Sequence, residues 1–192
     1  MLDLIKKLRD QTGVSIAEIK AVLEEAKGDE KKAIELLRAR GAMKAEKRAG
    51  KETKAGVVEA YIHSNKRLGV LVELLCETDF VARNPQFQEL AHEIALQVAS
   101  MNPQYVSADE ITPEVKEHEK EIYREEVVKT GKPANIVEQI VEGKFQKRCQ
   151  EICLLDQPFI KDQTITIRDL IHDAVAKVGE SIKVGKFVRF EV

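Results

Sequence analysis

Residues 57–78, VVEAYIHSNKRLGVLVELLCET, decide the fold of this chain. Two runs rich in β-branched and other apolar residues flank a short polar segment, SNKR at 64–67, which is typical of two antiparallel strands joined by a turn. Alternate residues of the second run fall on opposite faces of the sheet. One face carries Val70, Val72, Leu74 and Cys76, and the other carries Leu71, Glu73, Leu75 and Glu77.

The sequence after this hairpin predicts a helix that covers the sheet and a strand that joins it. From Asn84-Pro85 onward, apolar residues recur at intervals of three and four, as on the buried face of a helix. The final run, KFVRFEV at 186–192, alternates again and is expected to add a third strand to the hairpin. Residues 102–113, which contain two prolines, are expected to be a connection.

Two charged, amphipathic helices are expected at 114–130 and 134–152, joined around Gly131-Lys132-Pro133. Because the connection is short, they predict an antiparallel helical hairpin that projects from the body. Residues 156–163, DQPFIKDQ, are expected to form a loop, and a further helix is expected from about Ile167. Strands and helices are segregated along the chain rather than alternating, so the predicted fold class is α+β.

The first forty residues predict three short helices packed as a small bundle. Ser15 and Glu18 have the spacing of a capping box at the start of the second helix, and Asp29 is expected to cap the third. The glycines expected to end the three helices are Gly13, Gly28 and Gly41.

These patterns divide the chain into a three-helix bundle at 1–41, a basic linker at 42–55 and an α+β core at 56–192, with the helical hairpin at about 114–152. The linker, AMKAEKRAGKETKA, contains five basic and two acidic residues. It is interpreted as a solvated linker or as a fraying extension of the third helix. It lacks an aromatic residue on which a nucleic-acid base could stack.

Composition limits the classes of function. The chain has 192 residues, of which 43% are hydrophobic and 33% charged, and its net charge is −2. These values indicate a soluble globular protein and argue against a nucleic-acid binder that is basic overall. The N-terminal residues MLDLIKKLRD place charges where a signal peptide needs an apolar run, so a cytoplasmic location is expected.

The sequence contains no arrangement typical of catalysis. It has no phosphate-binding glycine-rich loop, no H-E-x-x-H and no G-x-S-x-G, and its four histidines are scattered. Cys76, Cys149 and Cys153 are interpreted as structural or incidental thiols, because a metal site at the last two would need more ligands than the nearby His172. We therefore expect no enzymatic activity, no cofactor and no bound metal.

One loop stands out, Thr78-Asp79-Phe80-Val81-Ala82-Arg83, between the end of a strand and the start of a helix. Such junctions lie on the surface and often carry contacts. Phe80 has two possible roles. It either turns inward and seals the end of the sheet, or it protrudes, braced by Asp79, as an aromatic anchor for a partner's pocket.

Four stretches, in order, carry a resemblance that spans nearly the whole chain. They are LIKKLRDQTGVSIAEIKAVLEEAKGDEKKAIELLRARGAMKAEKRAG at 4–50, CETDFVARNPQF at 76–87, EGKFQKRCQEICLLDQPF at 142–159 and VGKFVRFEV at 184–192. Together they resemble the bacterial elongation factor Ts family, the guanine-nucleotide exchange factors of elongation factor Tu. A single hairpin-helix unit lies between Gly56 and Asn102, as in the short form of the family.

The resemblance implies a ubiquitin-associated-like N-terminal bundle and an elongation factor that binds elongation factor Tu. It would promote GDP release and exchange for GTP by disturbing the Mg²⁺ and phosphate site, without covalent chemistry. Contacts are implied with the partner's nucleotide-binding domain and with a second, more distant domain. The implied partner-binding residues are Lys6, Arg9, Lys20, Leu68, Gly69, Thr78, Asp79, Phe80, Val81, Gln97 and Ile160.

Gln97 stands at a position that the family often fills with histidine, so its role differs from the family pattern. A short chain offers fewer contact surfaces, and a homodimer is therefore expected. Two other classes of function remain open. One is an adaptor that grasps ubiquitin-like folds, and the other is an RNA binder that uses Lys44, Lys47, Arg48 and Lys51.

Overall fold

The computed structural model describes residues 2–129 and 133–192. Its strands form an antiparallel sheet in the order β1-β2-β5, made of β1 (Ala55–Ile62), β2 (Leu68–Cys76) and β5 (Ile182–Glu191). The predicted hairpin and third strand are confirmed, and so is the α+β fold class. The central strand is β2, whose residues Val70, Val72, Leu74 and Cys76 are buried.

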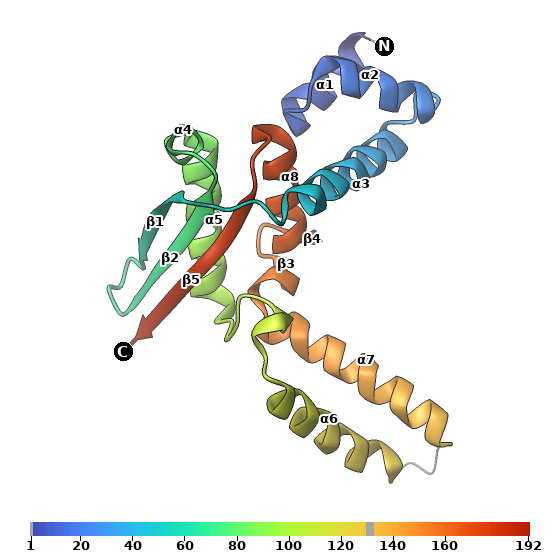
Figure 1. Ribbon diagram of the computed structural model, residues 1–192, viewed down its shortest axis with the longest axis vertical. Helices are drawn as coiled ribbons and strands as arrows, with labels where there is room; N and C mark the ends of the chain where they lie inside the picture. The colour runs from blue at the N-terminus through green and yellow to red at the C-terminus, as the bar shows by residue number, and fades with distance from the viewer. Residues whose placement is uncertain (1, 130–132) are drawn as a thin grey trace.

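One face of the sheet is covered by α5 (Pro85–Met101), and α8 (Ile167–Val178) packs beside that helix (Figure 1). The α5 helix begins where predicted, because the Asn84 side chain accepts a hydrogen bond from the backbone N–H of Gln86 at 2.9 Å. The α8 helix begins with a reciprocal capping box between Thr166 and Asp169. These two helices bury the inner face of β2 in the main core.

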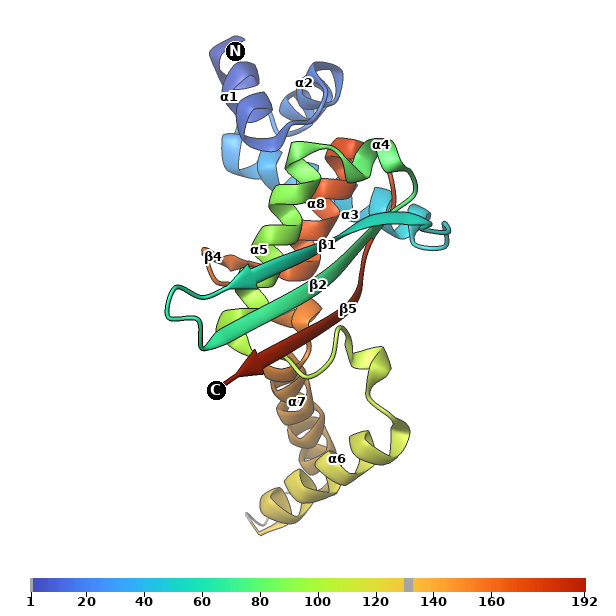
Figure 2. The same ribbon diagram turned by 90° about the vertical axis from the view of Figure 1, so that its left-hand side faces the viewer.

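The other face of the sheet is open: no described helix lies across it (Figure 2). Its outward side chains are nevertheless mostly apolar. Phe190 and Val58 are each 69% exposed and Ile62 is 64% exposed, and Leu71 and Val188 lie on the same face. An exposed apolar surface of this kind is unusual in a monomer.

The N-terminal part consists of α1 (Leu2–Thr12), α2 (Ile16–Glu25) and α3 (Glu30–Arg48). Gly13 ends α1 as predicted, with a positive φ of 66°. The Ser15 hydroxyl caps α2 by accepting from Glu18 N–H at 3.3 Å. The Glu18 carboxylate forms an ion pair with Lys44 Nζ at 2.7 Å. The side chain that would complete the predicted capping box is therefore bound to another group.

The expectation that Gly41 ends the third helix is wrong, because α3 continues to Arg48. Gly41 instead lies against α8, where a Cβ atom would sit 3.4 Å from the Cβ of Ala176. The packing of α3 against α8 stabilises the helix at this point and offsets the poor helix propensity of glycine. The first half of the basic segment at 42–55 is therefore helical, and the division of the chain into domains remains a prediction.

The predicted helical hairpin consists of α6 (Pro113–Val128) and α7 (Ala134–Ile152), and it projects from the rest of the molecule (Figure 1). Residues 130–132, and with them most of the expected connection, lie outside the described residues. Ion pairs join the two helices, at Lys120–Glu142, Arg124–Glu138 and Lys144–Glu126.

Residues 156–163 do not form the expected loop. They belong largely to a small antiparallel hairpin of β3 (Pro158–Phe159) and β4 (Asp162–Thr166). Two side chains stabilise this hairpin, one from α5 and one from the hairpin itself. The buried amide of Gln97 binds its backbone, and Asp162 accepts the Thr164 N–H at 3.0 Å. Two 3₁₀ turns, Ala108–Glu110 and Leu154–Asp156, complete the connections.

Candidate functional site

The loop after β2 presents Phe80 to solvent. Asp79–Ala82 form the single-turn helix α4, in which Phe80 is 84% exposed while Val81 and Ala82 are each 5% exposed. The two buried residues attach the turn to the core, and this orientation directs the phenyl ring outward. Of the two roles open for Phe80, the structure therefore excludes the seal at the end of the sheet.

Thr78 joins this turn to a distant part of the chain. Its backbone N–H donates to Glu180 Oε2 at 3.0 Å and its hydroxyl donates to Glu180 Oε1 at 2.7 Å. The same hydroxyl oxygen accepts from the N–H of Val81 at 3.5 Å and so caps α4. Thr78 was predicted as a site residue, but Glu180 was not, because the two are 102 positions apart in the sequence.

Glu77 forms a second link across the same junction. Its Oε1 accepts from the backbone N–H of Ser181 at 2.6 Å and from Arg48 Nη1 at 2.8 Å. These hydrogen bonds hold the pKa of the Glu77 carboxyl below its usual range, the Ser181 N–H being the larger cause. Arg48 is the last residue of α3, so this link also ties the N-terminal helices to the end of β2.

The predicted cationic contacts lie on the N-terminal helices. Lys6 and Arg9 are exposed on α1, and Lys20 is exposed on α2. These helices and α4 lie toward the same end of the long axis, opposite the α6–α7 hairpin (Figure 1). A partner that binds this end would meet both the cations and Phe80.

Leu68 and Gly69 are half-buried at the start of β2, whereas Phe80 follows the end of that strand. The length of the strand separates them by about 25 Å. The structure therefore does not bring these predicted contacts together, and a partner that reached both would have to extend along the sheet.

Gln97 lies inside the protein, with none of its surface exposed. Its Nε2 donates to Gln157 Oε1 and to the carbonyl of Pro158, each at 3.1 Å, and its Oε1 accepts from the N–H of Ile160 at 2.9 Å. A side chain with no exposed surface does not contact a partner in this conformation. The last of these bonds ties Gln97 to Ile160, a half-buried residue of the turn between β3 and β4.

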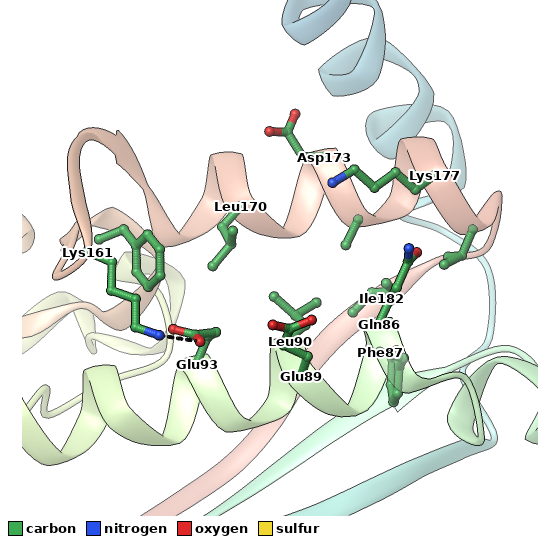
Figure 3. Close-up of a pocket in the computed structure, with 13 residues that line it drawn as sticks. Gln86, Phe87, Glu89, Leu90, Glu93, Lys161, Leu170, Asp173, Lys177 and Ile182 are labelled. Atoms are coloured by element: carbon green, nitrogen blue, oxygen red, sulfur yellow. Dashed lines mark hydrogen bonds and ion pairs between the residues drawn. The ribbon is translucent and has the colours of Figure 1, made fainter. Parts of the chain in front are cut away.

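A groove of about 460 Å³ lies between α5 and α8 (Figure 3). Its apolar lining includes Phe87, Leu90 and Leu170, and Lys161 pairs with Glu93 across one end at 2.6 Å. Burial raises the pKa of the Asp173 carboxyl in α8 above its usual range. The described lining residues include no histidine, cysteine, serine or threonine that could act as a nucleophile.

The three cysteines are buried and free. Burial raises the pKa of the Cys153 thiol to about 12, and burial also raises the pKa of Cys149. Both thiols are therefore protonated at neutral pH. In the described part of the chain, no group of three or more histidine, cysteine or acidic side chains is arranged to hold a metal ion.

The basic segment at 42–55 is partly engaged within the protein. Lys44 pairs with Glu18 and Arg48 pairs with Glu77. These pairs reduce the positive charge that the segment offers to a nucleic acid. Within the described residues, no helix is long and apolar enough to cross a membrane.

Comparison with known proteins gives a consistent result over the whole chain. The family model described as "Elongation factor TS" matches residues 3–192. The elongation factor Ts of Thermotoga petrophila is 52% identical over 191 residues, covering 100% of this chain and 95% of the relative. That of Thermosipho melanesiensis is 52% identical over 189 residues, with 98% and 96% covered. That of Fervidobacterium nodosum is 49% identical over 189 residues, with the same coverage.

Proposed function

The chain belongs to the elongation factor Ts family of translation elongation factors, and from this membership we propose that it binds elongation factor Tu and accelerates the exchange of GDP for GTP. The exchange changes no covalent bond. It proceeds because the protein stabilises the nucleotide-free state of its partner. The single observation that carries the proposal is the exposed Phe80 on a turn that Val81 and Ala82 anchor in the core.

Phe80 acts as a wedge beside the Mg²⁺ and phosphate site of elongation factor Tu. An exposed phenyl ring that enters an apolar pocket gains about 1.5–3 kcal/mol, and such anchors dominate the energy of many interfaces. Mg²⁺ demands near-octahedral coordination. A wedge that moves elements around the ion therefore weakens the hold on the nucleotide.

The other site residues divide by their exposure. Lys6, Arg9, Lys20 and Asp79 are exposed and make direct contacts with the nucleotide-binding domain. Thr78, also exposed, holds the α4 turn through its cap and its bonds to Glu180, and the buried Val81 attaches the turn to the core. Leu68 extends the contact along the sheet, whereas Gly69 lies between Ile62 and Phe190 on the open face. Ile160, held by Gln97, touches a second domain of the partner.

Binding of this protein and binding of nucleotide oppose each other. By linkage, the factor by which the protein weakens nucleotide affinity equals the factor by which nucleotide weakens the affinity of the protein. The protein therefore speeds exchange in both directions, and the cellular excess of one nucleotide sets the direction. Its place of action is the cytoplasm, where translation occurs.

A second copy of the chain covers the open face of the sheet. Val58, Ile62 and Phe190 on that face are each more than 60% exposed, and an apolar face of this kind favours self-association.

The test is stopped-flow release of a fluorescent GDP analogue from elongation factor Tu, with and without this protein. We expect release to accelerate by orders of magnitude and to saturate with protein concentration. If the folded protein leaves the rate unchanged with its cognate partner, the exchange function is wrong. Binding to ubiquitin-like folds without any effect on nucleotide would then support the adaptor alternative.

A further inference from the structure

The junction between β2 and α4 is closed by two carboxylates that cross between chain segments. The β2–β5 ladder ends at the pair Cys76 and Ile182. Beyond it, Glu180 accepts the backbone N–H of Thr78, and Glu77 accepts the backbone N–H of Ser181. Each segment thus supplies one carboxylate and one backbone donor. Side chains continue the hydrogen bonding where the strands no longer pair.

Glu180 also determines the orientation of the Thr78 hydroxyl group. The hydroxyl proton is donated to Glu180 at 2.7 Å, which leaves a lone pair for the Val81 N–H. A helix of one turn has little stability of its own. The α4 turn therefore depends on this cap and on the burial of Val81 and Ala82.

The position of Glu180 is set by the end of α8. Gly179 adopts a positive φ of 77° and donates its N–H to the carbonyl of Val175 at 2.8 Å. This left-handed residue ends the helix and redirects the chain. Glu180 follows it and is followed in turn by Ser181, which is 3% exposed. The carboxylate is therefore held between a helix end and a buried residue.

We infer that Glu180 is a positioning residue for the exchange reaction, which fixes the orientation of Phe80 through its two hydrogen bonds to Thr78. The inference rests on the proposed function of Phe80 as the wedge. Glu180 touches neither nucleotide nor metal. Its effect is to keep α4 in one conformation, so that Phe80 in the bound complex keeps the orientation that disturbs the Mg²⁺ and phosphate site.

The first experiment measures the order of the turn without any partner. The chain contains no tryptophan, so a Phe80→Trp variant carries a single indole whose fluorescence anisotropy reports the mobility of the turn. Adding Glu180→Ala is expected to lower the anisotropy, because Thr78 loses both acceptors. Thr78→Ser keeps both donors and is expected to leave it unchanged. Unchanged anisotropy with Glu180→Ala would overturn the inference.

The second experiment measures stimulated GDP release at saturating concentrations. Glu180→Ala is expected to lower the maximal acceleration about five-fold, the factor that corresponds to the loss of a helix cap. In a Phe80→Ala background, Glu180→Ala is expected to cause no further loss, because the two residues act through one element. Equal losses in both backgrounds, or a loss of affinity with the maximal rate unchanged, would overturn the inference.

Glu138→Gln serves as the matched control, because Glu138 also accepts two hydrogen bonds, from Arg124 in the α6–α7 hairpin. It is expected to leave the anisotropy and the maximal rate unchanged, and thermal unfolding verifies that each variant folds. If the native chain itself fails to accelerate GDP release, the proposed function is wrong, while the anisotropy experiment still decides whether Glu180 orders the turn.

Discussion

Phe80 combines high exposure with a firmly attached backbone, and this combination gives the most direct test of the site. Phe80→Ala is expected to reduce the stimulated rate of GDP release about 10- to 100-fold, which corresponds to the burial energy of one phenyl ring. Because the ring is 84% exposed, its removal should not change the melting temperature. Stopped-flow kinetics and thermal unfolding measure the two effects.

Ile122→Ala is the control for Phe80→Ala, since Ile122 is a large apolar residue that is 50% exposed on α6. It should leave exchange unchanged. A Phe80→Ala variant that folds normally and exchanges at the native rate would contradict the wedge.

The prediction for Gln97 concerns the stability of the fold rather than the rate of exchange. Gln97→Leu removes hydrogen bonds to Gln157, Pro158 and Ile160 and leaves buried polar groups without partners. The free energy of unfolding is expected to fall by about 2–3 kcal/mol, measured by chemical denaturation. Gln88→Leu, at an exposed position on the same helix, should change it by less than about 0.5 kcal/mol. Equal effects of the two would contradict the structural role of Gln97.

At the residue scale, the sequence predicts some features of the site and hides others. The Thr78–Arg83 loop is visible because an aromatic residue stands between a strand and a helix. The burial of Gln97 was also open to prediction, since Gln97 lies three residues after Ile94, on the apolar face of α5. The contact of Glu180 with Thr78 was not open to prediction, because the two residues are 102 positions apart and no local sequence pattern connects them.

At the scale of elements, the contact between α3 and α8 depends on the small size of Gly41. Gly41→Ala is expected to raise the free energy of unfolding by about 0.5–1 kcal/mol, because alanine favours the helix and its Cβ meets Ala176 at an ordinary contact distance of 3.4 Å. Gly41→Leu is expected to lower it, because the longer side chain has no room between the helices. Denaturation curves of both variants measure the difference. Stabilisation by both would show that the close contact is unimportant.

The α6–α7 hairpin is expected to loosen in acid. Hydrogen bonds and charges from Arg124 and Lys120 lower the pKa of Glu138 and Glu142, respectively, below the ordinary value of 4.5. A lowered pKa contributes stability that is present above the unfolded-state pKa and is lost as the pH falls through the folded-state pKa. The protection of the α6 and α7 amides, relative to the intrinsic exchange rate at each pH, should therefore fall below about pH 4.5, before that of the sheet.

Glu138→Gln removes one of these titrating groups and should weaken the pH dependence of exchange in the hairpin. The central strand β2 provides the internal reference, because its inner side chains are buried. If the hairpin and the sheet lose protection together at every pH, the ion pairs do not control the hairpin.

Periodicity predicts most of the elements but not their exact extent. The apolar spacing located α5, α7 and α8, and strict alternation located β2 and β5. Gly41 was misread because a glycine inside a helix resembles a terminator until its packing partner is known. The β3–β4 hairpin was missed because a buried side chain from another element, Gln97, supplies part of its hydrogen bonding.

At the scale of the whole molecule, the open sheet face predicts the state of association. The chain has a mass of 21.6 kDa, and analytical ultracentrifugation is expected to show a species of twice that mass. Phe190→Asp should convert it to the monomer, because a charge on this face cannot be buried without a partner. Val115→Asp places the same charge at an exposed apolar position on α6 and should leave the dimer intact. A native chain that sediments as a monomer would contradict the proposed dimer.

The whole-chain architecture is only partly visible in local patterns. The expected third strand follows from the alternation at 186–192, but alternation does not decide whether this strand pairs with β1 or with β2. That β2 is central, with β1 and β5 at its sides, is a property of the assembled sheet. The open apolar face was hidden for the same reason, since alternation shows that two faces exist but not which one a helix covers.

The crossed carboxylates at the end of the sheet also bear on the order in which the molecule folds. The helices of the N-terminal bundle and of the α6–α7 hairpin join near neighbours and close short loops. Pairing of Cys76 with Ile182 must close a loop of more than a hundred residues, and such non-local pairing is slow. Thr78 acquires its acceptors only when that loop has closed. The α4 turn is thus among the last parts to mature, and an incompletely folded chain presents the cationic helices without the group proposed to release the nucleotide.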